Sequence, residues 1–426
     1  MQTIFALATA RGKAGVAIMR VSGPEAFAIG CALCGSLPGA GRHGLRVVMS
    51  EDGAILDQAL VLVFEGPNSF TGEDVLELHL HGSVAVIRAV ERRIMATGLA
   101  REAEAGEFTK RALMNDQLDL AQVEGLGDLV EAETEAQRLQ AQHVFSGALS
   151  KKMNDLRATG LRAAALVTAT IDFADEEVPV NVAPEVLDLL DQLNSELTAE
   201  IDGSHIAERV RDGFEVAILG APNAGKSTLL NALAGRDIAI TSNVAGTTRD
   251  IIEARLDIAG LAVTFLDTAG LRETADEVEK IGVSRAIDRA IDADLRILLA
   301  SNGFELPARL QDKIDLTYGA KADVTGAGGV SGLTGEGLDR LISDVSALLS
   351  ERVVQVRATI SARQRGGMQR ARSEFIAAGE VMRGVGEVEI VAEHIQDGLR
   401  ALDSVIGRVD VENILGEIFS RFCIGK

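Results

Sequence analysis

A glycine-rich segment between Gly220 and Ser227 is the part of the sequence best suited to chemistry. It reads Gly-Ala-Pro-Asn-Ala-Gly-Lys-Ser and matches the phosphate-binding pattern G-x-x-x-x-G-K-[ST]. A strand-like apolar run, 214–219, precedes it, and helix-like sequence begins near Ser227. Glycines let backbone N–H groups turn toward phosphate oxygens, and a helix N-terminus favours an anion. We therefore expect Lys226 at the β- and γ-phosphates of a nucleotide and Ser227 at its magnesium ion.

Two further motifs follow in a fixed order. Gly246–Asp250 (Gly-Thr-Thr-Arg-Asp) lies about twenty residues after Lys226, where a switch segment offers a threonine to magnesium and the γ-phosphate. Asp267–Gly270 (Asp-Thr-Ala-Gly) ends a second apolar strand. We expect Asp267 to bind magnesium through water and Gly270 to donate its N–H to the γ-phosphate. Together the three motifs predict a GTPase domain of the translation-factor type.

The Asn-Lys-x-Asp motif that reads guanine is altered in this chain. Lys321 and Asp323 belong to Ala-Lys-Ala-Asp, which follows the strand-like run 314–319, and we expect Asp323 to accept hydrogen bonds from the guanine N1–H and 2-amino group. Asp315 ends a rival motif, Asp-Lys-Ile-Asp, but a proline-containing stretch that makes a poor buried strand precedes it. Neither motif has the asparagine.

The last guanine-contacting loop is expected at Ser331 and Gly332, in Ser-Gly-Leu-Thr-Gly-Glu-Gly. A backbone N–H of this loop should face the base oxygen. The stretch 302–330 is short for two helices and a strand, so we expect a reduced base side of the pocket.

Composition is that of a cytoplasmic protein of about three domains. The chain has 426 residues, 47% of them hydrophobic, and 42 basic against 63 acidic residues give a net charge of −21. This charge argues against strong non-specific nucleic-acid binding, so any such contact needs a local basic patch or a partner. No apolar run reaches the roughly twenty residues that cross a bilayer, and no basic segment precedes the apolar amino terminus. We expect no membrane association.

The cysteines and histidines carry weaker signals. Cys31, Cys34 and Cys423 are too few for a disulfide framework or a four-thiolate zinc site. Cys31 and Cys34 have redox spacing, but we interpret them as two buried thiols on one helix. His79 and His81 alternate and should point to one face of a strand, which we interpret as a polar face rather than a metal site.

Periodicity predicts a multidomain α/β and α protein. Residues 1–115 alternate short apolar runs with glycine and proline turns and one helix-like segment, as in an α+β domain. Long alanine-rich amphipathic segments fill 116–212 and return in 350–426. A Ras-like P-loop GTPase domain, 213–349, is therefore inserted into a discontinuous helical domain.

The motifs together resemble those of the MnmE (TrmE) family of tRNA-modifying GTPases. The phosphate loop, the two motifs after it, Asn68–Leu78, Gly106–Ala112 and the terminal Phe422–Lys426 carry the resemblance, which covers essentially the whole chain. It implies a tetrahydrofolate-binding amino-terminal domain, a helical domain and the inserted GTPase domain.

The resemblance implies a potassium-stimulated reaction. Asn223 would coordinate K+ beside the phosphates, where the ion takes the place of an arginine finger; an asparagine chosen only for turn geometry is the alternative. Many GTPases orient the attacking water with a glutamine where this chain has Leu271, and Glu279 matches the glutamate that does so in this family. The implied GTP-binding residues are Asn223, Ala224, Gly225, Lys226, Ser227, Thr228, Thr247, Thr248, Asp267, Gly270, Lys321, Asp323, Ser331 and Gly332, with Ser227 and Thr248 on magnesium, and Asn223, Ser242, Val244 and Thr247 on K+.

The resemblance also implies a site for 5-formyl- or 5,10-methylene-tetrahydrofolate in the amino-terminal domain. Arg20, Glu77 and Lys426 match its folate contacts, and Cys423 is a candidate for the modification chemistry. Gln117 stands where the family commonly has a lysine, which removes a charge available to the folate carboxylates. From the residues alone, Arg20 and Glu77 would be a partly exposed ion pair of little energetic value.

The implied function is GTP hydrolysis coupled to modification of C5 of the wobble uridine (U34) of certain tRNAs, together with the flavoprotein MnmG. The implied assembly is a homodimer through the amino-terminal domain, with potassium-dependent pairing of GTPase domains. Two alternatives are a regulatory GTPase switch in ribosome assembly or stress signalling, and a folate-binding module with a vestigial GTPase. The residues before the GTPase domain and the terminal motif argue against the first, and the intact phosphate and magnesium residues argue against the second.

Overall fold

The structure is a computed structural model whose described part comprises residues 1–172, 182–236, 238–240, 253–267, 287–301, 304, 306–326, 328–353, 361–384, 387–409, 419, 422 and 425. The chain divides into two compact units, which are described separately. One contains 1–127, 150–157 and 400–426, and the other contains 128–149 and 158–399.

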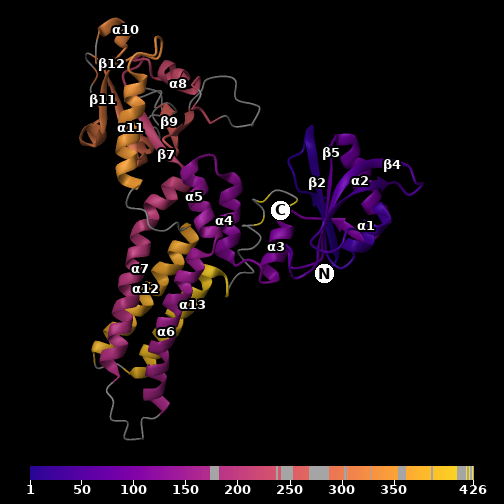
Figure 1. Cartoon of the computed structure of the whole chain (residues 1–426). Coiled ribbons are helices and arrows are strands. Elements are labelled where there is room, and N and C mark those ends of the chain that lie inside the picture. The colour runs from indigo at the N-terminus through magenta and orange to yellow at the C-terminus, as the bar shows by residue number, and fades with distance from the viewer. Residues whose placement is uncertain are drawn as a thin grey trace, which may run out of the picture. The chain divides into compact units, whose positions relative to one another are not determined.

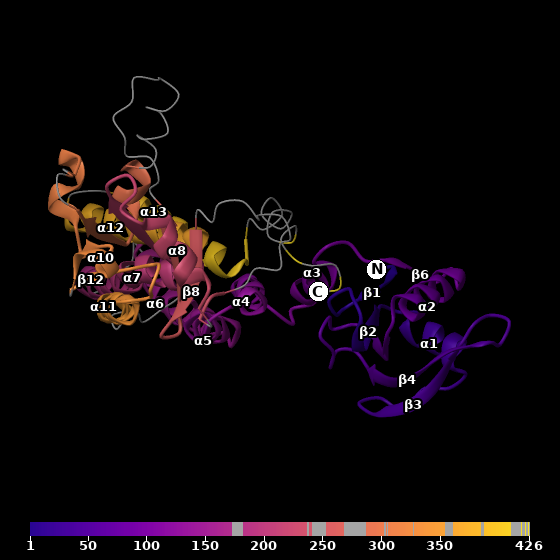
Figure 2. The same cartoon turned by 90° about the horizontal axis from the view of Figure 1, so that it is seen from above.

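The first unit is built on a six-stranded sheet with strand order β3-β4-β5-β2-β1-β6 (Figure 2). Strands β1 and β6 are parallel, and the other neighbours are antiparallel. The elements are β1 (Thr3–Leu7), β2 (Ala14–Ser22), α1 (Ala26–Cys34), β3 (His43–Met49), β4 (Ile55–Phe64), β5 (Val75–Gly82), α2 (Val84–Ala96), β6 (Ala100–Glu102) and α3 (Glu107–Met114).

Strand β1 is buried on both faces, which explains its uninterrupted apolar sequence. Phe5 and Leu7 belong to the core that α1 and α2 complete on one face of the sheet. Ile4 and Ala6 face the opposite way and pack with Phe108 of α3. Because side chains alternate along a strand, neighbours of Ala6 on adjacent strands lie on the α3 side.

The helical elements are α4 (Leu120–Glu131), α5 (Glu135–Phe145), α6 (Ala148–Asp172), α7 (Ala183–Asp212), α12 (Ala362–Arg383) and α13 (Val388–Ile406). Two of them begin with capping boxes, Thr134 with Gln137 at α5 and Ser361 with Gln364 at α12. Helices α7 and α12 lie side by side although about 180 residues separate their starts (Figure 1). None of the helices in the described part is long and apolar enough to cross a membrane.

The second unit contains the sheet that carries the phosphate loop, with strand order β12-β11-β10-β7-β9-β8. Only β8 is antiparallel to its neighbour, and the other pairs are parallel. The elements are β7 (Phe214–Gly220), α8 (Lys226–Ala234), β8 (Glu253–Ile258), β9 (Leu261–Asp267), β10 (Leu295–Ala300), the 3-10 helix η1 (Ala308–Lys313), β11 (Leu316–Ala320), α10 (Ala322–Thr325), β12 (Gly329–Val330) and α11 (Leu338–Val353).

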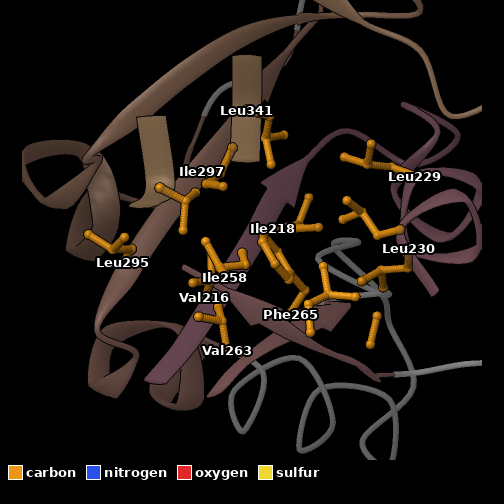
Figure 3. Close-up of a cluster of buried hydrophobic side chains, with 14 of the residues drawn as sticks. Val216, Ile218, Leu229, Leu230, Ile258, Val263, Phe265, Leu295, Ile297 and Leu341 are labelled. Atoms are coloured by element: carbon orange, nitrogen blue, oxygen red, sulfur yellow. The ribbon is translucent and has the colours of Figure 1, made fainter. Parts of the chain in front are cut away.

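The core of this sheet fixes the start of the phosphate loop. Val216 and Ile218 of β7 meet Leu229 and Leu230 of α8 and Phe265 of β9 in one buried cluster (Figure 3). The strand before the loop and the helix after it are thus packed against each other. Between β10 and β12 the described residues form, besides β11, only η1 and the four-residue α10, in agreement with the expected short base side.

Helix α5 contacts the β8–β9 turn directly. The backbone N–H of Ala136 donates to the Gly260 carbonyl at 3.1 Å, and Gln137 Nε2 donates to the Arg211 carbonyl at 2.8 Å. Arg255 of β8 forms an ion pair with Glu133, just before α5, at 2.9 Å. The helical part and the sheet of the second unit are therefore connected by hydrogen bonds as well as by the chain.

Gly398 of α13 provides a test of the helix packing. A Cβ atom at Gly398 would lie 2.5 Å from Cε1 of the fully buried Phe375 ring of α12. We expect Gly398→Ala to lower the free energy of unfolding by about 1–3 kcal/mol, because overpacking outweighs the gain in helix propensity.

Gly366→Ala in α12 is the matched control. The nearest atom to its added Cβ would be Arg370 Nη1 at 3.6 Å, which can move. This variant should be stabilised by about 0.5–1 kcal/mol. Urea unfolding followed by circular dichroism measures both, and equal shifts of the two midpoints would contradict the packing argument.

Candidate functional site

The phosphate loop has the backbone geometry that anion binding requires. Asn223 and Gly225 have positive φ angles of 63° and 96°. Such angles are open to glycine and tolerated by asparagine. At Gly220, a Cβ atom would lie 2.8 Å from the Leu299 carbonyl oxygen of β10. Glycine is therefore required at Gly220 by a close backbone approach and at Gly225 by its φ angle.

Lys226 and Ser227 begin α8 and lie where a nucleotide would need them. Lys226 is 7% exposed, and its Nζ donates to the carbonyls of Gly220 and Ala221 at 3.0 and 2.9 Å. The ammonium group is thus held across the loop, close to the N–H groups that phosphate oxygens would meet.

Ser227 and Asp267 form a pair suited to magnesium. Ser227 Oγ donates to Asp267 Oδ2 at 2.6 Å, which joins the start of α8 to the end of β9. Asp267 Oδ1 is buried and has no hydrogen-bond partner among the described residues. A buried carboxylate oxygen without a donor fits a hard cation, and hydroxyl and carboxylate oxygens are ligands that Mg2+ prefers. The described residues therefore fit the expected ion.

A pocket of about 330 Å3 joins the phosphate loop to the predicted base-reading residues. Lys321, Asp323, Ser331 and Gly332 line it together with Ala224, Gly225 and Thr228. At Gly332, a Cβ atom would lie 2.5 Å from the Leu229 backbone nitrogen, so this loop lies directly on α8. The four base-side residues predicted from the sequence are thus brought together.

Asp315 lies elsewhere. It precedes β11, at the amino end of the strand, whereas Lys321 and Asp323 follow its carboxyl end. Asp315 Oδ2 accepts from the Arg296 backbone N–H at 2.8 Å and forms an ion pair with Arg296 Nη2 at 2.9 Å. Its carboxylate is occupied in holding β10 to β11, which is a structural role.

Sequence reasoning missed the larger apolar residues that line the pocket, among them Leu299, Val324 and Leu333. Leu299 comes from β10 and is buried, whereas Val324 and Leu333 are each 78% exposed. Leu333 lies inside the predicted loop 331–337 and could have been noticed there as an unusually exposed leucine. No local signal marks Leu299, because its place in the pocket follows from strand pairing with β7.

Several predicted residues lie outside the described part. They are Ser242, Val244, Thr247 and Thr248 of the switch segment and K+ set, Gly270, Leu271 and Glu279 after β9, and Cys423 and Lys426 at the carboxyl terminus.

A second group of polar residues lies on the α3 side of the amino-terminal sheet. Arg20 Nε forms an ion pair with Glu77 Oε1 at 2.8 Å across β2 and β5. The Arg20 guanidinium carbon lies 5.5 Å from the centroid of the Phe70 ring and 5.7 Å from that of Phe108. His79 Nε2 lies 3.3 Å from Glu77 Oε2. A cation between two aromatic rings beside a carboxylate suits a flat, polar ligand.

Gln117 lies at a neighbouring position. A Cβ atom at Gly72 would lie 3.2 Å from Gln117 Cγ, and Gly72 follows Phe70 by two residues in the same loop. Gln117 Nε2 donates to the Asn115 carbonyl at 3.3 Å. The loop 70–72 therefore touches both parts of the predicted folate site.

An ion-pair network that sequence reasoning missed supports this loop. Arg111 of α3, which is 3% exposed, pairs with both Glu73 and Glu107 at 2.9 Å. Glu73 also accepts from Ser22 Oγ at 2.7 Å. Burial raises the pKa of Glu107, but hydrogen bonds from Arg101, a backbone N–H and Arg111 outweigh it and lower the pKa to about 2. Glu107, which holds Arg111 in this network, therefore stays charged at neutral pH.

Three described residues near the carboxyl terminus, Phe419, Phe422 and Gly425, belong to this unit. A Cβ atom at Gly425 would collide with the Leu7 carbonyl oxygen, and one at Gly106 would lie 2.9 Å from the Phe419 ring. The Phe419 and Phe422 rings have centroids 5.8 Å apart. Leu7 precedes the β1–β2 turn, and Ala6 pairs with Arg20, so Gly425 lies near the strand that carries Arg20.

The remaining chemical candidates are ordinary surface and core groups. His81 Nδ1 bonds to Asp57 Oδ1 at 2.8 Å, and no cluster of three potential metal ligands occurs within the described residues. The expectation for the cysteines is half wrong: Cys34 is buried, but Cys31 is exposed. Both lie on α1, and only positions facing the sheet are covered. Burial raises the pKa of Cys34 to about 11, so its thiol is inert.

Comparison with known proteins covers the whole chain. The family model described as GTP-binding protein TrmE N-terminus matches residues 3–117, and the MnmE helical domain model matches residues 120–423. Proteins named tRNA modification GTPase MnmE from a Jannaschia species, Roseobacter denitrificans and Cereibacter sphaeroides are 63%, 52% and 54% identical, each over 100% of both chains.

A solved structure gives a much weaker likeness. An Era variant from Aquifex aeolicus bound to GDP and AlF4− is 24% identical over 38% of this chain and 66% of that chain, with a TM-score of 0.25. The two family models and the full-length relatives agree with each other and with the phosphate-loop geometry. The chain therefore belongs to the MnmE (TrmE) family of tRNA modification GTPases.

Proposed function

We propose that this chain is a potassium-stimulated GTPase that acts with a flavoprotein of the MnmG type to modify C5 of the wobble uridine of certain tRNAs, using a one-carbon tetrahydrofolate. One observation carries the proposal: the chain has both a P-loop site and, in its amino-terminal unit, a second site of polar and aromatic side chains. The family models match almost the full length of the same chain. A regulatory switch sharing only the GTPase domain would not need the second site.

The domain boundaries are part of this proposal. We infer a folate-binding domain in 1–115, a GTPase domain in 213–349, and a helical domain formed by 116–212 and 350–426. The family matches at 3–117 and 120–423 support the first boundary. The P-loop sheet, from Phe214 to Val330, lies within the second match and supports the insertion.

Hydrolysis in this proposal depends on residues that hold the phosphates and the ions. Lys226 would exchange its two backbone acceptors for the β- and γ-phosphate oxygens, and Ser227, Asp267 and Thr248 would hold magnesium. Bound there, magnesium and potassium would supply positive charge against the charge that develops on the transferred phosphoryl group. Glu279 orients the attacking water, since Leu271 has no hydrogen-bonding atom on its side chain.

Asn223 is proposed as the potassium ligand of the phosphate loop. Its side chain is exposed and makes no hydrogen bond to another described residue, so the amide oxygen is free to bind a cation. Its φ angle of 63° also explains why asparagine is acceptable in the turn. A test must therefore separate the side chain from the backbone. Ser242, Val244 and Thr247 would complete the set.

The folate proposal rests on Arg20, Glu77 and the two aromatic rings near Arg20. A pterin ring can stack beside the rings while its ring nitrogens meet the Glu77 carboxylate. Gln117 can donate a hydrogen bond but adds no charge, and Lys426 would supply one from the terminal motif. Titration calorimetry with 5-formyltetrahydrofolate measures this directly, and absence of binding at millimolar ligand would remove the folate from the proposal.

The proposed homodimer uses the uncovered face of the amino-terminal sheet. Val16, Leu45, Val47 and Leu60 are 37–58% exposed on β2, β3 and β4, whereas α1 and α2 cover the other face. An apolar sheet face of this kind is typical of a protein interface. Pairing of GTPase domains under potassium would be a second, nucleotide-dependent contact.

The proposed function predicts a specific loss from cellular tRNA. In cells lacking this chain, mass spectrometry of nucleosides should show tRNAs with the C5 modification missing from U34. Wild-type protein should restore it, and Lys226→Ala should not, because the phosphates lose their cation. Lys151→Ala, which removes an exposed lysine of α6, is the matched control and should restore it fully. Unchanged nucleosides in the deletion would overturn the proposal.

Potassium dependence predicts a distinct behaviour for Asn223→Gly. Glycine keeps the left-handed backbone and removes only the amide. We expect the wild-type rate of GTP hydrolysis to rise by at least about tenfold when K+ replaces Na+, and the variant to lose most of this response while binding GDP almost normally. A variant that keeps the full response would show that Asn223 serves the turn alone.

Base recognition predicts a change of nucleotide preference at Asp323. An amide reverses part of the hydrogen-bonding pattern offered to the ring. Asp323→Asn should therefore lower the affinity for guanine nucleotides and raise the affinity for xanthine nucleotides, changing their ratio by about tenfold or more. Asp315→Asn should instead leave preference unchanged and lower thermal stability, because it weakens the pair with Arg296. Fluorescent-nucleotide competition measures the preference, and a switch at Asp315 would contradict the assignment.

A further inference from the structure

Charge is distributed unevenly along this acidic chain. Residues 1–115 contain 11 basic and 12 acidic residues, a net charge of −1, whereas the remaining residues contain 31 basic and 51 acidic, a net charge of −20. A polyanion approaching the protein meets least repulsion at the amino-terminal domain. A polyanion should therefore bind where this domain exposes basic side chains that have no acidic partner.

Most arginines of the domain's interior are neutralised by partners. Arg20, Arg101 and Arg111 each form ion pairs with glutamates. By contrast, Arg11, Lys13 and Arg88 are exposed, and their side chains make no hydrogen bond or ion pair to any described residue. The same holds for Arg42 and Lys110 elsewhere in the domain, but Arg11 and Lys13 lie together in one turn. Arg92 is also exposed, and only its Nε donates a hydrogen bond, to the Arg88 carbonyl.

Arg11, Lys13 and the start of α2, which carries Arg88, lie at one end of the sheet, and Arg92 follows Arg88 by one helical turn. Arg11 and Lys13 are in the β1–β2 turn, immediately before Ala14, and Ala14 pairs with Gly82 at the end of β5. Helix α2 begins two residues after Gly82, so its first turns lie at the same end as the β1–β2 turn. Arg88 and Arg92 are four residues apart and share one face of α2. Glu91 is the helix's one acidic residue.

Gly425, near the carboxyl terminus, lies at the same end of the sheet. Gly425 lies against Leu7 and Ala8, at the base of the β1–β2 turn. Arg20 lies six residues along β2 from Ala14, which is about 20 Å in an extended strand. The cations are thus separate from the Arg20–Glu77 site but adjacent to the strand against which Gly425 lies.

We propose that Arg11, Lys13, Arg88 and Arg92 form a tRNA-binding surface, the basic hairpin surface, which contacts phosphates of the substrate near the wobble uridine. This inference rests on the proposed tRNA substrate. Exposed arginine and lysine side chains without intramolecular partners bind phosphates at little desolvation cost, and such contacts orient a nucleic acid without reading its sequence. The surface gives the acidic chain a local basic patch on the domain that carries the second site.

The test uses the full-length chain and a fluorescent, unmodified tRNA transcript that contains U34. The triple variant Arg11→Gln, Lys13→Gln and Arg88→Gln should bind about tenfold to thirtyfold more weakly near 0.1 M salt, and the slope of log K against log salt should fall by about 2 to 3. GTP hydrolysis should be unchanged, because none of these residues belongs to the P-loop site. The matched control, Lys151→Gln, Lys313→Gln and Arg370→Gln, removes three exposed cations that also lack partners among the described residues, and should keep the wild-type affinity and slope.

The outcomes separate this surface from the proposed function. If the triple variant binds tRNA as tightly as the wild type, the proposed surface is wrong, but the tRNA function is unaffected. If the triple variant and the control lose affinity for tRNA equally, the loss reflects the overall charge of the chain, and the proposed surface is again wrong. A triple variant that binds tRNA normally but loses affinity for polyglutamylated folate would reassign the cations to the folate tail. No tRNA binding by the wild type at any salt concentration would overturn both the surface and direct substrate binding by this chain.

Discussion

The close approach of Gly220 to the Leu299 carbonyl is the constraint on which the nucleotide site depends. It brings β7 and β10 together at the point where the chain leaves the sheet, and it leaves no space for a Cβ atom. The chain must then turn through left-handed positions at Asn223 and Gly225 before α8 begins. Since β7 and α8 are fixed in one core, the loop's N–H groups stay in place without a ligand. Preorganisation of this kind reduces the entropy lost when phosphate binds.

Local sequence patterns predicted the elements around this loop well. Apolar runs and glycines, which act within a few residues, predicted the strands β7, β9 and β11 and the start of α8. A proline predicted that no strand forms in 306–311, just before Asp312. The pairing of Ser227 with Asp267 was also predictable, because parallel strands end at one edge of the sheet. Family resemblance, rather than spacing, supplied the folate residues and the roles of Asn223 and Glu279.

Contacts between distant segments were not predictable from the residues alone. Arg111 reaches Glu73 across 38 positions, and nothing in either segment identifies the other as its partner. The position of Gly425 against Leu7 links the two ends of the chain, and a lone terminal glycine carries no periodic signal. Exposure of Cys31 was missed because the helix α1 is apolar around its circumference, so sequence could not indicate which face meets the sheet.

The use of charge follows one rule in both units. Carboxylates and arginines pair where they hold elements together, as at Asp315 with Arg296 and Glu107 with Arg111, and burial makes each such pair expensive to break. Two sets of groups without a partner among the described residues lie where a ligand is expected: Asp267 Oδ1 beside Ser227, and the cations of the β1–β2 turn. A chain with 21 excess negative charges has ample acid to neutralise every arginine. Single unpaired cations such as Lys151, Lys313 and Arg370 are ordinary surface charges, whereas neighbouring unpaired cations such as Arg11 and Lys13 indicate a partner outside the chain.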